Sequence, residues 1–234
     1  MKKILIITIP LIVLTAFITF LFIAPSDNLH IAEPLTPIII DSPEYYTALS
    51  INDIIEMNAG QVSIEYSKCE YRKGMAEKIE GVFTTGLIFT PEDAVKALTS
   101  VRDIFDISSF SYAYTPGPDI YHQPCFELTQ LHEGIEVIYG YFRIFASDEG
   151  IPKSIWGRYI DIGEINTEPS LSPKEASKSF AFNKDTNILE TKLVIFGTNE
   201  SDIILCWYFN MFGREVFVDA HTGVIVYDES TIDW

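Results

Sequence analysis

Histidines and carboxylates come closest to a catalytic pattern at His132-Glu133-Gly134-Ile135-Glu136. A zinc-peptidase helix needs two histidines four residues apart on one helical face, with a glutamate after the first. Glu136 stands where the second histidine would be, and the surrounding pattern is typical of strand and turn. The remaining histidines are His30, His122 and His221. Of these, His221 alone has a possible metal ligand at suitable spacing, Asp219. With no nucleophile elbow and no phosphate-binding loop, we expect no catalytic site, no metal and no cofactor.

The three cysteines, Cys69, Cys125 and Cys206, are an odd number, so at least one thiol is unpaired within a single chain. Cys206 lies in an apolar run and is expected to be a small buried residue. A Cys69–Cys125 disulfide stays open, because spacing alone cannot decide it.

Alternating apolar and polar residues predict three strands between Phe126 and Tyr159. The first begins at Phe126 and ends near Gly134, where a positive φ would allow the chain to reverse. Ile135 to Ala146 forms the second, with Gly140 inside it as the mark of a bulge or a close approach. Asp148 to Gly150 provides the next turn, and Ser154 to Tyr159 the third strand.

Helix starts are marked by capping residues. Thr90-Pro91-Glu92-Asp93 and Ser172-Pro173-Lys174-Glu175 both predict a capped first turn, and Ser50 to Met57 predicts a short helix. Further strands are expected from alternation, whereas the proline- and glycine-containing stretch from 112 to 123 is expected to be loop. These strands are Val62–Tyr66, Lys192–Phe196, Ile203–Met211, Glu215–Asp219 and Val224–Tyr227. The chain therefore shows twice the order of a helix followed by antiparallel strands.

The motif residues resemble a known family. The order aromatic-x-Leu-x-Gln-x-x-x-Gly-Ile-x-Val-x-x-Gly, followed by a strand and Asp-x-Gly, resembles the FTP segment of thermolysin and fungalysin propeptides. Its motif positions are Gln130, Gly134, Val137, Gly140 and Gly150. Downstream, a strand ending in Asp219-Ala220-His221-Thr222-Gly223 resembles the adjoining PepSY segment, in which this position is a structural turn. The resemblance covers about residues 91 to 228 and implies a small helix-on-sheet module.

Together these patterns predict an α+β fold of two consecutive lobes, each a helix packed on a curled antiparallel sheet. One N-terminal transmembrane helix is expected to precede them. The predicted parts are a transmembrane signal anchor at 1–26, an extended tether at 27–46 and an FTP-like lobe at 47–162. A linker at 163–172, a PepSY-like lobe at 173–228 and a tail at 229–234 complete the chain.

The N-terminus indicates the compartment. Lys2 and Lys3 precede an uncharged run of 21 residues from Ile4 to Ala24, long enough at helical rise to cross a bilayer. Because no Ala-x-Ala cleavage site follows, we favour an uncleaved signal anchor in the cell membrane, with residues 27–234 outside. Secretion after cleavage of the signal is the alternative.

The charge of the chain excludes one class of partner. The formal net charge is −17. Because Lys2 and Lys3 are the only charged residues before residue 27, the remainder has 14 basic against 33 acidic residues, a net charge of −19. Such a surface repels nucleic acid and anionic lipid headgroups.

Two classes of function follow. In thermolysin-like zymogens the propeptide assists folding and covers the active-site cleft, and here no peptidase domain follows before Trp234. The resemblance thus implies an extracytoplasmic protein that binds, inhibits or chaperones a secreted thermolysin-type metallopeptidase in trans. The alternative is a non-catalytic ectodomain that binds cell-wall or surface proteins. Candidate partner-binding residues come from an aromatic run and the acidic tail: Trp207, Phe212, Asp228, Asp233 and Trp234.

Overall fold

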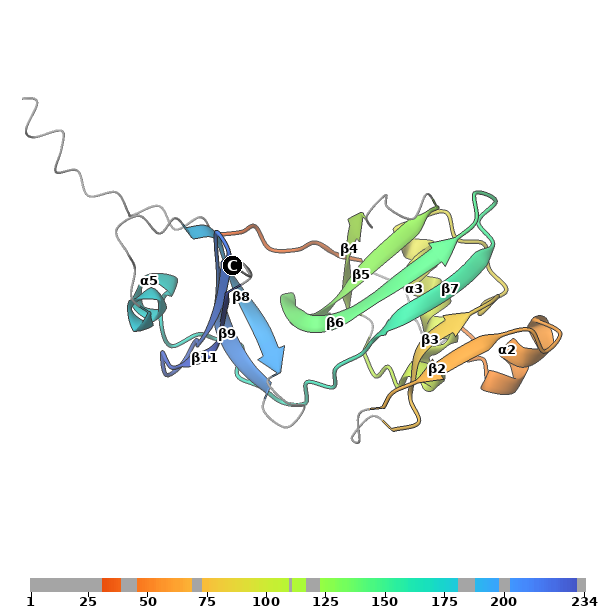
Figure 1. Ribbon diagram of the computed structural model, residues 1–234, viewed down its shortest axis with the longest axis horizontal. Coiled ribbons are helices and arrows are strands. Elements are labelled where there is room, and N and C mark those ends of the chain that lie inside the picture. The colour runs from red at the N-terminus through yellow and green to blue at the C-terminus, as the bar shows by residue number, and fades with distance from the viewer. Residues whose placement is uncertain are drawn as a thin grey trace, which may run out of the picture.

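Strands dominate the fold because most of the chain alternates apolar and polar residues. The computed structural model describes residues 31–38, 46–68, 73–109, 111–116, 123–180, 188–197 and 203–230. Within them, eleven strands form one mixed sheet, and the helices are short (Figure 1). The strands are β1 (Pro37–Ile38), β2 (Ser63–Tyr66), β3 (Ala76–Glu80), β4 (Tyr112–Pro116), β5 (Cys125–His132), β6 (Ile135–Ala146), β7 (Pro152–Arg158), β8 (Ile188–Gly197), β9 (Ile203–Met211), β10 (Arg214–Asp219) and β11 (Ile225–Ser230).

The helices begin where the capping residues predict. α2 (Ile51–Met57), α3 (Pro91–Ser100) and α5 (Pro173–Ala176) each carry a complete capping box, so these three predictions are confirmed. α4 (Arg102–Phe105) follows α3, and a 3₁₀ turn, η4 (Ser177–Ser179), follows α5.

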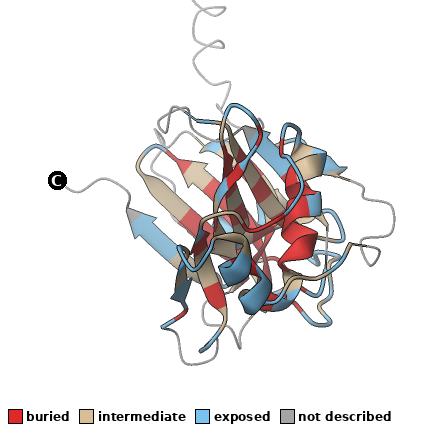
Figure 2. Ribbon diagram, turned by 90° about the vertical axis from the view of Figure 1, so that its right-hand side faces the viewer, coloured by how far each residue is buried: buried red, intermediate tan, exposed pale blue. Residues whose placement is uncertain are grey.

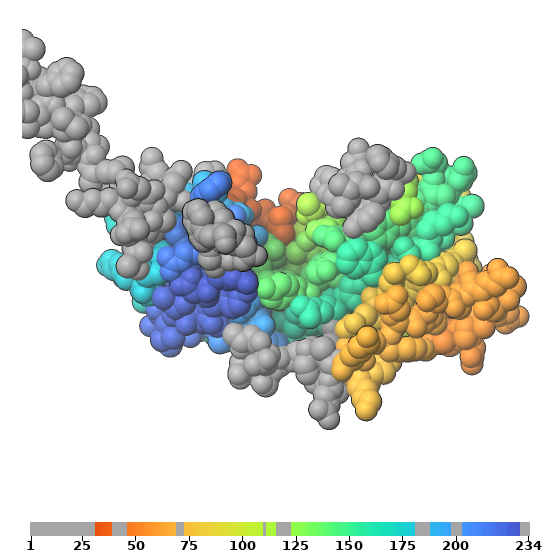
Figure 3. Space-filling view, in the orientation of Figure 1, coloured from red at the N-terminus to blue at the C-terminus, as the bar shows by residue number. Residues whose placement is uncertain are grey.

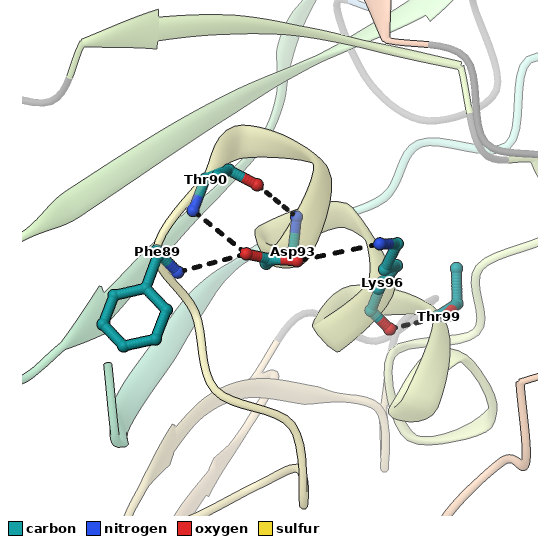
Figure 4. A network of polar contacts seen from close by, with 5 residues as sticks. All are labelled: Phe89, Thr90, Asp93, Lys96 and Thr99. Atoms are coloured by element: carbon teal, nitrogen blue, oxygen red, sulfur yellow. Dashed lines mark hydrogen bonds and ion pairs between the residues drawn. The ribbon is translucent and has the colours of Figure 1, made fainter. Parts of the chain in front are cut away.

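The start of α3 illustrates the capping (Figure 4). The Asp93 carboxylate accepts hydrogen bonds from the backbone N–H groups of Phe89 and Thr90, at 3.3 and 3.2 Å. The Thr90 hydroxyl accepts from the Asp93 N–H at 3.1 Å, and Lys96 lies 3.7 Å from the same carboxylate. Donors left free by the first helical turn are thereby satisfied.

The predicted fold class is wrong. Instead of two lobes, each a helix on its own antiparallel sheet behind a transmembrane helix, one continuous sheet runs through both halves. The join is a parallel pairing of β6 with β8, in which Glu136 faces Val194 and Val137 faces Ile195. The second helix is also too short to back a sheet, because Ser177, Lys178 and Ser179 continue α5 only as a 3₁₀ turn.

Membrane crossing was part of that prediction. No helix in the described part of the chain is long and apolar enough to cross a bilayer. The predicted anchor, residues 1–26, lies outside the described residues.

The prediction of loop from 112 to 123 is wrong in its first part. Tyr112 to Pro116 form β4, which pairs with β5 on one side and β1 on the other. Tyr112 and Ala113 are buried, and the strand stops at Pro116, whose lack of an N–H suits a strand end.

The segment from Ile31 to Ile38, placed in the predicted tether, contacts both halves of the sheet. Ile31 bridges to Thr191 of β8, and the Ala32 N–H donates to the Thr191 carbonyl at 2.8 Å. Pro37 and Ile38 form β1 beside β4. Figure 3 shows these residues (red-orange) at the surface between the C-terminal strands (blue) and the central strands (green).

The buried apolar residues form three clusters. The first lies between α2, α3, α4 and the strands β3 to β7, and includes Leu98, Phe105 and Phe142. Figure 2 shows such buried residues (red) along a helix and the strands beside it. The second cluster packs the β8–β11 strands against Ala176 of α5 and Phe180. The third lies on the other face of those strands and contains Val194, Phe196, Cys206, Tyr208 and Phe217.

Candidate functional site

Gln130, Val137 and Gly140 meet where β6 passes from β5 to β8. The Gln130 amide donates to the Ile160 carbonyl at 2.7 Å and accepts from the Ile160 N–H at 2.9 Å. A Cβ on Gly140 would lie 2.5 Å from the Gln130 amide oxygen, so the glycine makes room for this clamp. Val137 is buried in the second cluster. These three positions therefore have structural roles at the bulge in β6.

Gly134 and Gly150 shape the two hairpin turns. Glu133 and Gly134 both have positive φ, at 52° and 82°, which is typical of a type I′ turn between β5 and β6. Gly150 has φ of 78°, and a Cβ there would lie 2.6 Å from the Phe89 ring. The glycine therefore leaves space for the Phe89 ring, and its positive φ is a conformation that larger residues rarely adopt.

Asp219, Ala220 and Gly223 build the turn between β10 and β11. The Asp219 carboxylate accepts from the N–H groups of His221 and Thr222 at 2.7 and 3.0 Å, and Gly223 has φ of 76°. Burial raises the pKa of Asp219, but these hydrogen bonds outweigh it and leave the pKa below its usual value. Ala220 is fully buried. This is a closed structural turn.

The histidines in the described part of the chain, His132 and His221, do not converge with other ligand-type side chains. The His221 ring faces the linker, at 3.1 Å from the Ser170 hydroxyl and 3.3 Å from the Asn166 carbonyl, and His132 ends β5 beside its turn. Within the described ranges, no three His, Cys, Asp or Glu side chains gather in an arrangement that could hold a metal. His30 and His122 lie outside those ranges.

Both described thiols are free. Burial, with the nearby Asp219 charge, raises the pKa of Cys206 to about 12, so it is a protonated core residue. Burial also raises the pKa of Cys125. Cys125 is thus not bonded to Cys69, the partner left open from the sequence, which itself lies outside the described residues.

The feature best suited to binding is one face of the β8–β11 strands. Two side-chain rows cross it in register, and we call this surface the tyrosine–carboxylate face. Its carboxylate row contains Glu190, Asn210, Glu215 and Glu229, and its aromatic row contains Lys192, Tyr208, Phe217 and Tyr227. Figure 1 shows α5 beside these strands, and Ala176 of α5 packs on the opposite face. Within the described chain, no helix residue belongs to the third cluster, which includes Tyr208 and Phe217 of the aromatic row.

Tyrosine hydroxyls connect the two rows. Tyr208 donates to Glu215 at 2.7 Å, and Tyr227 donates to Glu229. Burial and the hydrogen bond to Glu215 raise the pKa of Tyr208 well above its ordinary value. The hydrogen bond to Glu229 raises the pKa of Tyr227 to about 12. Both phenols are therefore neutral donors at physiological pH.

Ring contacts within the aromatic row, and with Phe196 and Tyr139 beside it, hold the side chains of this face in place. Phe196 stacks on Phe217 with centroids 4.3 Å apart, and Tyr208 and Tyr227 lie 5.0 and 5.8 Å from Phe217. Tyr139, 46% exposed, extends this cluster from the β6 bulge, where its φ is 66°. A bulky residue with positive φ is strained, and such strain concentrates at functional positions.

The predicted partner-binding residues separate when placed in the structure. Trp207 is buried on the opposite face, where its indole N–H donates to the Leu171 carbonyl at 2.7 Å. Phe212 is 85% exposed at the tip of the β9–β10 turn, next to the carboxylate row. Asp228 forms a bidentate ion pair with Arg214, at 2.8 and 2.6 Å. Asp233 and Trp234 lie outside the described residues.

Sequence reasoning missed the residues that give the face its charge. Glu190 and Lys192, Glu215 and Phe217, and Tyr227 and Glu229 are each two apart within a strand, so each pair shares a face. That spacing is visible in the sequence and could have identified the pairs, but not the alignment of the rows between strands.

Comparison with protein-family models and with curated protein sequences finds no match. Among solved structures, the chain is similar to the Bacillus megaterium YpeB C-terminal domain, with a TM-score of 0.41 and 15% identity. The similarity covers 80% of this chain and 100% of that one, and it is distant.

Proposed function

We propose that this chain is a non-catalytic, extracytoplasmic binding protein that associates in trans with a secreted thermolysin-type metallopeptidase, as an inhibitor or a folding chaperone. The observation that carries this proposal is the tyrosine–carboxylate face, where carboxylates and the Tyr227 ring lie beside the buried rings of Tyr208 and Phe217 and over which no described helix packs. Aromatic side chains flanked by polar groups are enriched where proteins bind proteins.

Two features of the sequence support the class of partner and the compartment. The resemblance of the sequence to propeptide segments is the reason for proposing a thermolysin-type peptidase as the partner. Lys2, Lys3 and the uncharged run to Ala24 support export of the remainder.

The experiment titrates the purified full-length chain against a thermolysin-class peptidase at micromolar ratios. We expect slower hydrolysis of a small peptide substrate or a higher refolding yield of the denatured peptidase, with no effect on a serine peptidase. Gel analysis separates binding from competition by cleavage, because a true inhibitor stays intact while hydrolysis is slowed. Unchanged hydrolysis and unchanged refolding yield would contradict the proposal and favour the surface-protein alternative.

A further inference from the structure

We infer that the tyrosine–carboxylate face recognises a lysine or arginine side chain of a partner protein, held between the carboxylate row and the Tyr227 ring. This rests on the proposed function only in taking the partner to be a protein. The inference follows from the charge of the face, from the geometry of its rows and from a basic side chain already held there.

The charge of the face is unbalanced. Glu190, Glu215 and Glu229 supply its carboxylates, and Lys192 is its basic member. The Lys192 ammonium is already engaged with Glu136, at 2.8 Å, and with Glu190, at 3.7 Å. Glu215 and Glu229 are paired to tyrosine hydroxyls, which are neutral, so no cation among the described contacts compensates their negative charge. A carboxylate has more acceptor sites than one hydroxyl fills, so Glu215 and Glu229 can both accept further hydrogen bonds from an incoming cation.

The geometry suits a cation with a long apolar stem. Side chains two apart along a strand are separated by about 6.6 Å, and neighbouring strands by about 4.8 Å. Glu215 is two residues from Phe217 along β10, and Glu229 is two residues from Tyr227 along β11, so each carboxylate is about 6.6 Å from the ring position on the same face. An ammonium or guanidinium between the rows can bond a carboxylate while its stem lies on a ring.

Lys192 shows within the chain how such a cation is held. Its ammonium lies 5.2 Å from the Tyr208 ring centroid while it pairs with Glu136. The same combination of ring and carboxylates, formed by Tyr227, Glu215 and Glu229, repeats two strands away. A partner's lysine or arginine would complete that second arrangement.

Phe212 adds an apolar contact at the rim. It follows Met211 at the hairpin tip, two residues beyond Asn210 of the Asn210–Glu215 pair, and is 85% exposed. The net charge of −17 on the chain also favours encounter with a basic surface. The expected partner segment therefore carries a basic residue beside an apolar one.

The test uses the full-length chain and a synthetic peptide of alternating lysine and leucine, with a matched norleucine-for-lysine peptide as comparison. Titration calorimetry should show that Glu215→Gln/Glu229→Gln weakens lysine-peptide binding at least tenfold. The control variant Glu92→Gln/Glu168→Gln removes the same charge from exposed positions elsewhere and should change affinity less than twofold. Far-ultraviolet circular dichroism confirms that each variant is folded.

Equal weakening by both variants, equal affinity for the norleucine peptide, or no binding of the lysine peptide at millimolar concentration would overturn the inference. These outcomes are independent of the peptidase. If the lysine peptide binds as expected but the peptidase titration shows no effect, the proposed function fails and this inference stands.

Discussion

Gln130 and Gly140 show how two residues act as one structural unit. Gln130 is 2% exposed, and its side-chain amide bonds both the N–H and the carbonyl of Ile160, as a neighbouring strand would. The space for this amide exists because Gly140 has no side chain. The two positions should therefore be energetically coupled.

We predict that Gly140→Ala lowers the free energy of unfolding by about 1–3 kcal/mol, because the added methyl displaces the amide. Gln130→Ala should cost about 1–3 kcal/mol through the two lost hydrogen bonds. In the double variant the methyl enters space vacated by the glutamine, so its cost should fall below the sum by at least about 0.5 kcal/mol. Urea denaturation measures all three variants.

Gly197→Ala is the matched control for this cycle, since no atom lies within 4 Å of a Cβ there. It should change stability by less than about 0.5 kcal/mol. Additive single-variant costs, or a Gly140→Ala protein as stable as the parent, would show that the clamp does not depend on the glycine.

At the scale of elements, the β10–β11 turn depends on one carboxylate. Asp219 bonds two backbone N–H groups that would otherwise lack a partner in the turn. Its folded pKa is lowered, so its stabilising effect is present above the unfolded value of about 3.9. The effect is lost as the pH falls through the lower, folded pKa.

We predict that Asp219→Ala lowers the free energy of unfolding by about 1–2 kcal/mol at pH 7. The difference from the parent should begin to shrink as the pH falls below about 4, where the unfolded carboxyl is protonated, and should vanish below the lower, folded pKa, where the parent's folded carboxyl is protonated too. Denaturant titrations at a series of pH values measure this, with exposed Asp148→Ala as the control. A difference that stays constant down to the acid limit would mean that the charge is not what holds the turn.

Local elements were predictable from sequence, and long-range pairings were not. Thr90 and Ser172 predict helix starts because a capping box joins residues only three positions apart in the sequence. The loop prediction failed at Tyr112 because the neighbouring prolines and glycine masked a strand that β5 and β1 stabilise. A strand's own pattern does not say which partner lies along its free edge. For that reason the β6–β8 pairing and the alignment of Glu190, Glu215 and Glu229 emerged only from the structure.

At the scale of the whole molecule, the described helices lie apart from the tyrosine–carboxylate face. α2, α3 and α4 close the first core, and Ala176 of the short α5 packs with Phe180 on the second, which leaves the tyrosine–carboxylate face to the strands alone within the described chain. β11 offers a partner a second way to bind at this face, along its edge, because its one described strand partner is β10. A partner seated on the face would also reach the outward N–H groups of β11.

The most direct measurement is amide hydrogen exchange of the full-length chain with and without a thermolysin-type peptidase inactivated at its catalytic glutamate. We predict slower exchange in the Met211–Arg214 turn and along β11, with exchange in α2 and β2 unchanged. Slower exchange confined to α2 and β2, or no change anywhere in the chain, would contradict this prediction.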